Sequence, residues 1–266
     1  MPDPQALALV DWVEDGRRPA VIAIAPHLPV TVQRDLRPTF RSDGTYLVTG
    51  GFGGLGRSTA LWLAHNGACC IAVAQLDGAD RPLRGVVHTA GVLRDKPFLE
   101  IEAEDITHVP EPKAAGALAL HEATKERDLD LFVMFSSISA VLGSKRQTNY
   151  CAANGFMDGL AHVRRKQGLP ALSANIGAVS QVGMSSGASV EGHLRRMGLP
   201  PISPQLVLTG ISVALAGDLP QVVVSAEIDW DRMVRYKPTV ALGRCRIPAI
   251  CARSTSWPAG SASSRR

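Results

Sequence analysis

The sequence predicts an α/β protein built on one doubly wound parallel sheet with helices on both faces. Apolar runs of strand length alternate with helical patterns from residue 45 to residue 229, the order typical of a parallel sheet. Most of these runs are apolar throughout, which favours strands buried on both faces. A glycine-rich turn joins the first run to the first helical stretch, as in nucleotide-binding sheets. With 266 residues, 45% of them hydrophobic, the chain can bury one large core.

Each element follows from a local pattern of apolar residues and end signals. The strands are expected at residues 45–50, 69–74, 85–90, 131–137, 171–177 and 221–229. The helices are expected at residues 53–68, 113–128, 149–168 and 203–217. Gly168 and Pro170 mark the end of the third helix, and Ser203 and Pro204 mark the capped start of the fourth.

The connection between the second and third strands is shorter than the usual crossover. Only ten residues, Gln75 to Arg84, separate the apolar runs Ile71–Ala74 and Gly85–Thr89. A parallel pair normally needs about a dozen residues or more, usually including a helix. Ten extended residues reach about 33–36 Å and the return path needs about 20 Å, so the chain can close. We expect the second strand to lie at an edge of the sheet.

Composition divides the chain into three parts. Residues 1–36, with a short helix expected at 4–14 and a short strand at 20–25, fit the end of an upstream domain. Residues 37–236 form the α/β domain. Residues 237–266 have the Arg, Ser, Pro and Ala bias of a disordered tail, although a chain read out of frame would also have this composition.

Charge and cysteine content exclude several classes. Residues 237–266 hold six basic side chains and no acid, so subtracting them from the net charge of +4 leaves −2 for residues 1–236. A nucleic-acid partner is therefore not expected. No apolar run approaches about 18 residues, so no membrane span is expected. The acidic start lacks the basic region followed by an apolar region that a secretory signal has, so a cytoplasmic protein is expected. The cysteines are expected to be free thiols, and no metal site is expected. The cysteines are Cys69, Cys70, Cys151, Cys245 and Cys251.

The glycine-rich turn predicts a dinucleotide site. Five glycines lie between the expected first strand and first helix, where backbone N–H groups and the helix N-terminus can approach a pyrophosphate. A glycine turn required only for packing is the alternative. The glycines are Gly50, Gly51, Gly53, Gly54 and Gly56.

The adenosine side of this site is weakly marked. No basic residue directly follows the second strand, where a 2′-phosphate would need one. Arg81 and Arg84 are the nearest candidates, and Asp77 could serve a ribose 2′-hydroxyl instead, although a loop acid is more often only solvated.

A tyrosine, an asparagine, a serine and a lysine suggest proton-transfer chemistry. Ser137 ends an apolar strand, Tyr150 lies in the first turn of the next helix, and Asn154 follows four residues later on the same helix face. A phenol has an unperturbed pKa of about 10 and donates a proton to a ketone readily only if a cation stabilises the phenolate. Lys113 could supply that charge. A packed tyrosine and a solvated lysine are the alternatives.

At these residues the chain resembles the ketoreductase domains of modular polyketide synthases, members of the short-chain dehydrogenase/reductase superfamily. The matching stretches, from Arg37 to Trp230, include TYLVTGGFGGLG, LRGVVHTAGVL, PKAAGALALHEAT, FVMFSSISAVLGS, NYCAANGFMDGLAHVRRKQGLPALS and QVVVSAEIDW. The resemblance implies a Rossmann-like fold and the NADPH-dependent reduction of a β-ketoacyl thioester. It also implies two kinds of partner: an acyl carrier protein that bears this chain on its phosphopantetheine arm, and other polyketide synthase domains.

The resemblance gives four residues a catalytic role. It implies that Ser137 hydrogen-bonds the substrate carbonyl, Tyr150 protonates it, Lys113 lowers the pKa of the phenol and Asn154 orders the proton relay. In most short-chain reductases a lysine lies four residues after the tyrosine. In this branch asparagine takes that place and the lysine comes from the preceding helix, as here. The implied cofactor contacts are Thr49, Gly50, Gly51, Gly53, Gly54, Leu55, Gly56, His88, Thr89, Ala90 and Gly91.

Two further positions concern the stereochemistry of the product. In this family one class has a Leu-Asp-Asp motif and the other a tryptophan near the tyrosine. Residues 93–95 here read Leu-Arg-Asp, and Leu142 stands where the tryptophan would be. Asn149 fits the first class, whereas Lys145 replaces its proline. The resemblance therefore favours the D-hydroxyl product, with Asp95 and Asn149 as the residues concerned. Asp95 as an ordinary loop acid is the alternative.

The family also accounts for the short connection. It would place a helix, a strand and another helix, roughly fifty residues, between Ala74 and Arg84. The chain therefore resembles a reductase that lacks one strand and two helices of its cofactor lobe. A non-catalytic remnant with poor cofactor binding is the alternative function. A sugar-nucleotide epimerase, with similar Ser/Tyr chemistry, is disfavoured because it expects a lysine where Asn154 lies.

Overall fold

The computed structural model describes residues 38–73, 81–180, 182 and 187–238. The helix expected at 4–14, the strand expected at 20–25 and the tail from residue 239 onward lie outside the described residues, as does Asp77. No described helix combines the length and apolarity that a bilayer crossing requires.

The described residues form one parallel sheet of six strands, in the order β2-β1-β3-β4-β5-β6. The predicted sheet is therefore confirmed. Along it, Thr49 pairs with His88 and Ser137 pairs with Ile176, so the carboxyl ends of the strands meet at one edge. The strands are β1 (Thr45–Thr49), β2 (Cys70–Ala72), β3 (Leu83–His88), β4 (Leu131–Ser137), β5 (Leu172–Ile176) and β6 (Gln221–Val224).

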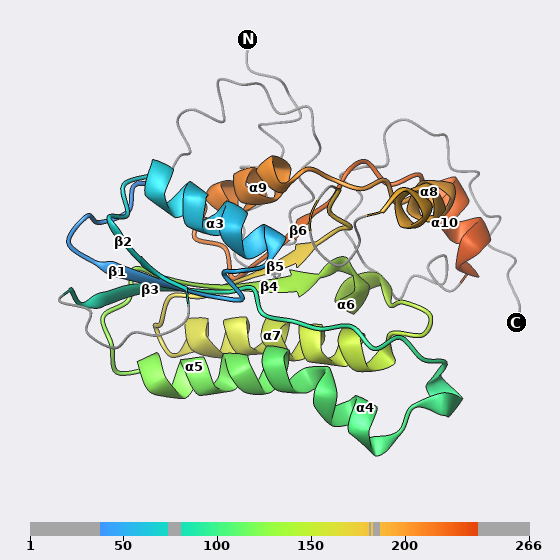
Figure 1. Ribbon diagram of the computed structural model, residues 1–266, viewed down its shortest axis with the longest axis horizontal. Coiled ribbons are helices and arrows are strands. Elements are labelled where there is room, and N and C mark those ends of the chain that lie inside the picture. Colours follow the sequence, from blue (N-terminus) through green and yellow to red (C-terminus); the bar gives the residue numbers. More distant parts are fainter. Residues whose placement is uncertain (1–37, 74–80, 181, 183–186, 239–266) are drawn as a thin grey trace, which may run out of the picture.

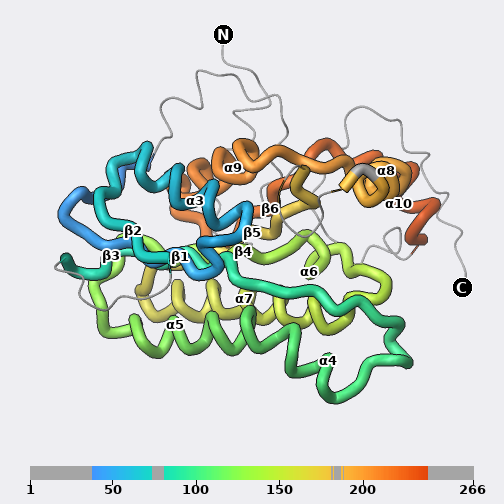
Figure 2. The backbone as a smooth tube through the Cα atoms, viewed as in Figure 1, coloured from blue at the N-terminus to red at the C-terminus, as the bar shows by residue number. Residues whose placement is uncertain are grey.

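Helices cover both faces of the sheet, as Figures 1 and 2 show. α3 (Gly54–His65) and α9 (Pro204–Ala216) lie over one face. α5 (Gly116–Thr124) and α7 (Thr148–Lys166) lie over the other. The expected cap of α9 is present, because the Ser203 hydroxyl accepts a hydrogen bond of 3.2 Å from the backbone N–H of Leu206.

Alternate residues of each central strand point to opposite faces, so one apolar strand supplies two cores. In β4, Leu131, Val133 and Phe135 pack with the residues under α3 and α9. Phe132 and Met134 pack instead with α5 and α7. All five are buried. This two-sided burial explains why the strand is apolar at every position.

Among the described residues, four short α-helices have no counterpart in the sequence prediction. The last of them, α10, spans Trp230–Tyr236, a stretch assigned to the α/β domain for which no helix was predicted. The Asp229 carboxylate caps α10 by accepting from the backbone N–H of Arg232, and Met233 anchors it in the core. Three of the four helices have seven residues or fewer, too few turns to show a period. The four are α4 (Ala103–His108), α6 (Ile138–Leu142), α8 (Ala188–Arg196) and α10 (Trp230–Tyr236).

Strand β2 lies at an edge of the described sheet, as expected, and pairs only with β1 among the described residues. It is shorter than the predicted run of residues 69–74, and its three residues are only partly buried. Ten residues separate Ala72 from Leu83, and the described ones among them, 73 and 81–82, contain no helix.

The glycine turn between β1 and α3 is tightly packed. Gly50 has a φ of +70°, a conformation that favours glycine. A Cβ atom built on Gly56 would lie 2.2 Å from the carbonyl oxygen of Gly50, so the first turn of α3 can approach the end of β1 only because position 56 has no side chain. Packing alone therefore requires a glycine here.

The substitution Gly56→Ala should lower the free energy of unfolding by about 1–3 kcal/mol, because backbone must move to accept the methyl group. Gly159→Ala is a matched control, since a Cβ there meets nothing within 4 Å and Gly159 lies inside α7. The control should be stabilising by about 0.5–1 kcal/mol. Urea denaturation of both variants measures the difference. Equal stabilities would contradict the packing argument.

A buried arginine links α7 to α5 on the second face. The Arg164 side chain is fully buried, and its guanidinium lies 3.8 Å from the ring centroid of Phe132. It donates to the Pro170 carbonyl at 3.1 Å and to Nδ1 of His121 at 3.0 Å. Burial lowers the pKa of Arg164 to about 10, so it stays charged at neutral pH. Because Nδ1 of His121 accepts this bond, the imidazole is neutral in the folded protein.

This contact should make stability depend on pH. Burial, and then the Arg164 charge, lower the pKa of His121 in the folded protein. The unfolded chain takes up that proton near pH 6.5, so the free energy of unfolding should fall as pH drops below about 6.5. The His121 share of the slope is at most about 1.4 kcal/mol per pH unit. Denaturation between pH 5 and 8 should show a shallower decline for His121→Gln than for the wild type, and equal slopes would exclude this coupling.

Candidate active site

Three predicted segments meet at the carboxyl edge of the sheet. The glycine turn follows β1, residues 88–91 end and follow β3, and Ser137 ends β4. A Cβ built on Gly50 would lie 2.8 Å from both the backbone nitrogen of Ala90 and the hydroxyl of Thr89. The two segments expected to contact the cofactor therefore pack against each other, because neighbouring parallel strands end side by side.

The start of α3 suits a bound anion. The N-cap residue is Gly53, whose position gives no side-chain cap, and the first turn, which starts with Gly54 and Leu55, contains no acid. Its first backbone N–H groups therefore keep their hydrogen-bonding capacity, and the helix dipole favours negative charge there. Thr49, Gly50 and Gly51 lead directly into this turn. The geometry fits the pyrophosphate of a dinucleotide.

His88 is a structural link between the strands. Its Nδ1 lies 2.6 Å from the Thr49 hydroxyl and its Nε2 lies 3.0 Å from the Lys113 carbonyl oxygen. Since that carbonyl can only accept, Nε2 carries the proton and Nδ1 accepts from the hydroxyl. Burial lowers the pKa of His88 to about 4. The imidazole is thus neutral near pH 7, and both ring nitrogens are engaged.

Lys113 is the buried residue of a π-helical turn, Glu111–Ala115, directly before α5. Its Nζ donates to the backbone carbonyl of Phe135 in β4 at 2.9 Å and lies 5.3 Å from the ring centroid of Tyr150. A Cβ on Gly91 would lie 2.7 Å from Cε of Lys113. Burial lowers the pKa of Lys113 to about 8, and the charge of Asp158 opposes that shift. The structure therefore brings the lysine between the residues after β3 and the tyrosine.

Tyr150 lies in the first turn of α7 and is partly buried. Burial raises the pKa of its phenol, while the nearby Asn154 and Ser137 side chains lower it. Ser137, Asn154 and Lys113 therefore lie near the Tyr150 side chain.

Asn154 has a free acceptor inside the site. The side chain is fully buried, and its Nδ2 donates to the Tyr150 backbone carbonyl at 2.7 Å. Its Oδ1 has no hydrogen-bond partner among the described residues.

The hydroxyl of Ser137 accepts two hydrogen bonds from Ser139, one from the backbone N–H at 3.1 Å and one from the side-chain hydroxyl at 2.9 Å. The proton of the Ser137 hydroxyl is therefore available for another acceptor.

The two residues expected to govern stereochemistry lie in different surroundings. Asp95 is exposed and accepts from Nε2 of Gln147 at 2.9 Å. Asn149 is buried, and its side chain contacts backbone groups of Arg94, Asp105 and Tyr150.

The sequence analysis did not identify a polar network that joins α7, β5 and the end of β4. Asp158 accepts from Ser173 at 2.6 Å and from Asn175 at 2.8 Å. Asn175 also donates to the Ser136 hydroxyl and to the Ser137 carbonyl. The spacing of four residues from position 150 to 154 and on to 158 was the available signal, since it puts all three side chains on one helix face. This network holds the end of β4 against α7.

The structure does not bring Arg81 or Arg84 to the glycine turn. Both lie beside the amino end of β3, where Leu83 pairs with Thr45, at the opposite edge of the sheet. Arg81 donates to the Ser42 carbonyl, and Arg84 pairs with an aspartate at residue 128. Neither is placed to hold a 2′-phosphate.

The chain matches a family model described as "KR domain" at residues 44–75 and 71–181. Among curated proteins it is 35% identical to the polyketide synthase GfsA of Streptomyces halstedii, over 79% of this chain and 3% of that protein. It is 34% identical to the reducing polyketide synthase DEP5 of Fusarium langsethiae, over 69% of this chain and 10% of that protein. The chain thus spans a small part of these relatives.

Solved structures agree. "Structure of A-type Ketoreductases from Modular Polyketide Synthase" matches with a TM-score of 0.70 and 29% identity, over 82% of this chain and 52% of that one. "The first ketoreductase of the tylosin PKS" matches with a TM-score of 0.67 and 30% identity, over 76% of this chain and 52% of that one. About half of each solved chain has no counterpart here.

The alignment lengths indicate that this chain lacks residues that its relatives have. The match to the Streptomyces protein runs over 258 residues but covers 79% of 266, about 210, so 48 aligned positions face a gap in this chain. For the Fusarium protein, 226 aligned residues against 69% of 266, about 184, leave 42. The family match breaks at residues 71–75, directly before the short connection. These findings agree with the expected loss of roughly fifty residues.

The fold, the arrangement around Tyr150 and these matches lead to one assignment. The chain belongs to the KR-domain family, the ketoreductases of polyketide synthases.

Proposed function

We propose that this chain reduces the β-keto group of an acyl thioester carried by an acyl carrier protein, with NADPH as reductant. The observation that carries the proposal is the position of the Lys113 ammonium, 5.3 Å from the Tyr150 ring and against the segment that follows β3. A phenol beside a buried cation, at the edge where the glycine turn lies, suits proton donation to a carbonyl oxygen.

In this proposal each side chain has one task. The Ser137 hydroxyl donates a hydrogen bond to the ketone oxygen and holds it near the Tyr150 phenol. Tyr150 gives its proton to that oxygen, and the Lys113 ammonium stabilises the phenolate that remains. The free Oδ1 of Asn154 can accept from a water that returns a proton to the site. A bound reduced nicotinamide supplies the hydride for the carbonyl carbon.

The described residues suit the pyrophosphate of the cofactor better than its adenosine. The uncapped start of α3 and the packed segment Thr89–Gly91 provide a cradle for pyrophosphate and its neighbours. On the adenosine side, neither Arg81 nor Arg84 is available, because both lie at the amino ends of the strands, whereas the glycine turn lies at the carboxyl ends. We therefore expect weak binding and little preference for NADPH over NADH, because the cation that would select the 2′-phosphate is not supplied by either arginine.

We assign the reductase unit to residues 37–236 and place it in the cytoplasm with other polyketide synthase domains as partners. We retain the D-hydroxyl product as the expected outcome, because residues 93–95 keep the second acid of the motif and position 142 holds leucine. A non-catalytic remnant is the second candidate function. The short edge strand β2 and the ten-residue connection favour it, since a lost part of the cofactor lobe removes adenosine contacts.

Tyr150→Phe should lower turnover of a β-ketoacyl thioester by about 10²–10⁴-fold, because it removes the proton donor and little else. NADPH binding, followed by nicotinamide fluorescence, should stay as in the wild type. Tyr236→Phe is the matched control, since that exposed phenol lies on α10. A wild-type protein that binds no NADPH even at millimolar concentration would support the remnant.

Turnover should fall as pH rises through about 8. Burial lowers the pKa of Lys113 to about 8, so the ammonium that stabilises the phenolate is lost above that pH, well below the ordinary lysine value of about 10.5. In Lys113→Arg the guanidinium stays protonated, and the alkaline fall should move to higher pH even if the rate is lower. A profile of kcat against pH measures both variants. A wild-type rate that is constant from pH 7 to 10 would contradict this assignment.

A further inference from the structure

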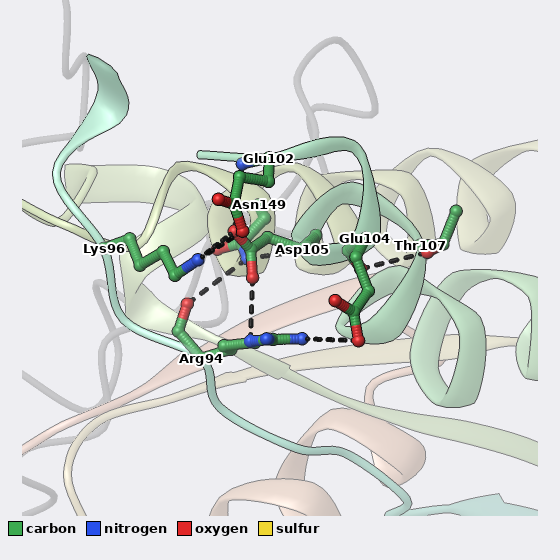
Figure 3. A network of polar contacts seen from close by, with 7 residues as sticks. All are labelled: Arg94, Lys96, Glu102, Glu104, Asp105, Thr107 and Asn149. Atoms are coloured by element: carbon green, nitrogen blue, oxygen red, sulfur yellow. Dashed lines mark hydrogen bonds and ion pairs between the residues drawn. The ribbon is translucent and has the colours of Figure 1, made fainter. Parts of the chain in front are cut away.

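Asp105 lies at the centre of a charged network beside the proposed active site (Figure 3). Its carboxylate is completely covered. Oδ1 lies 2.8 Å from Nε of Arg94, and Oδ2 lies 2.8 Å from Nζ of Lys96. Oδ2 also accepts from the backbone N–H of Glu102 at 2.9 Å. Lys96 and then this backbone donor lower the pKa of the carboxyl, so it is ionised at neutral pH.

The same two cations also form ion pairs with two exposed glutamates. Arg94 lies 3.2 Å from the carboxylate of Glu104, and Lys96 lies 3.0 Å from that of Glu102. Glu102 and Asp105 also form a reciprocal capping box at the start of α4. The network therefore fixes residues 94–96 to the first turn of this helix. Exposed pairs alone would contribute little, whereas the covered carboxylate needs both cations.

Asn149 connects this network to the tyrosine. Its Nδ2 donates to the Asp105 carbonyl at 3.1 Å and lies 3.4 Å from the Arg94 carbonyl. Its Oδ1 accepts from the backbone N–H of Tyr150 at 2.8 Å. One buried amide thus joins α4, residues 94–96 and the first turn of α7, as the close view shows (Figure 3).

Two more contacts join residues 94–96 to the chain just before Tyr150. The backbone N–H of Lys96 donates to the carbonyl of Arg146 at 2.9 Å. The Asp95 carboxylate accepts from Gln147 at 2.9 Å. All three residues of this segment therefore contact residues 146–149.

We propose that Asp105 is a positioning residue that aims the Tyr150 phenol and the Asp95 carboxylate by clamping residues 94–96 and, through Asn149, the first turn of α7. Asn149 influences stereochemistry in the same way, by holding backbone groups. Arg94, which replaces the first acid of the family motif, is turned toward Asp105 and has become part of this clamp. The inference rests on the proposed reductase function for its effect on product, but its effect on Tyr150 does not need substrate.

The main test is Asp105→Asn, which keeps the shape and removes the charge that Arg94 and Lys96 require. The first readout is the ultraviolet titration of the Tyr150 phenol, isolated by subtracting the titration of Tyr150→Phe. The midpoint should move from its wild-type value, because the phenol no longer keeps its place relative to Ser137 and Asn154, whose side chains lower its pKa. The second readout is turnover of a β-ketoacyl thioester, where kcat should fall about tenfold or more and the ratio of the two hydroxyl epimers should change. NADPH binding should be unchanged.

The controls separate positioning from loss of stability. Asp43→Asn breaks an exposed pair with Arg41 and should alter neither readout. Arg94→Gln is the milder second variant if Asp105→Asn does not fold, and it should move both readouts in the same direction. The epimer ratio does not depend on the fraction of folded protein, so a purely structural role would leave it fixed.

Folded Asp105→Asn, or Arg94→Gln in its place, with the wild-type phenol midpoint would overturn the proposal. An unchanged epimer ratio in an active variant would do the same. Absence of turnover in the wild type would count against the reductase function alone. In that case the phenol titration still decides whether Asp105 positions Tyr150.

Discussion

The buried ammonium of Lys113 is the interaction on which the site depends. A lysine nitrogen inside a protein is costly unless hydrogen bonds and opposite charge compensate it. Here the Phe135 carbonyl accepts from it at 2.9 Å and the charge of Asp158 favours the protonated form. The lysine comes from the turn before α5, and its acceptor comes from β4. This one side chain therefore links that turn to the carboxyl end of β4 and places a cation beside Tyr150.

The two halves of the sheet differ in completeness. The half from β3 to β6 is covered on both faces and carries the buried networks around Asp158 and Arg164. The other half ends at β2, a three-residue strand that is only partly buried. The alignments with the curated relatives leave 42 to 48 aligned positions without a residue of this chain, and the family match breaks at residues 71–75, in this half. Under the proposed function, we therefore expect the truncation to affect dinucleotide binding more than the arrangement around Tyr150.

Long elements with consistent patterns were predictable from the sequence. The strands of the sheet were found because burial on both faces requires apolar residues at nearly every position, as in residues 131–135. The long helices followed from their period and their end signals, of which Ser203 is an example. The short helix from Trp230 was missed, because its stability comes from the Asp229 cap and the buried Met233.

The sequence by itself determined the order of the elements, the glycine turn and the spacing that puts Tyr150 and Asn154 on one helix face, since these depend on neighbours along the chain. Only the tertiary structure decided that Arg84 lies at the amino ends of the strands, away from the glycine turn, and that Asn149 is buried against backbone groups. It alone also paired Arg94 with a covered carboxylate. Such contacts join residues that are far apart in sequence, and their strength depends on burial, which no local pattern records.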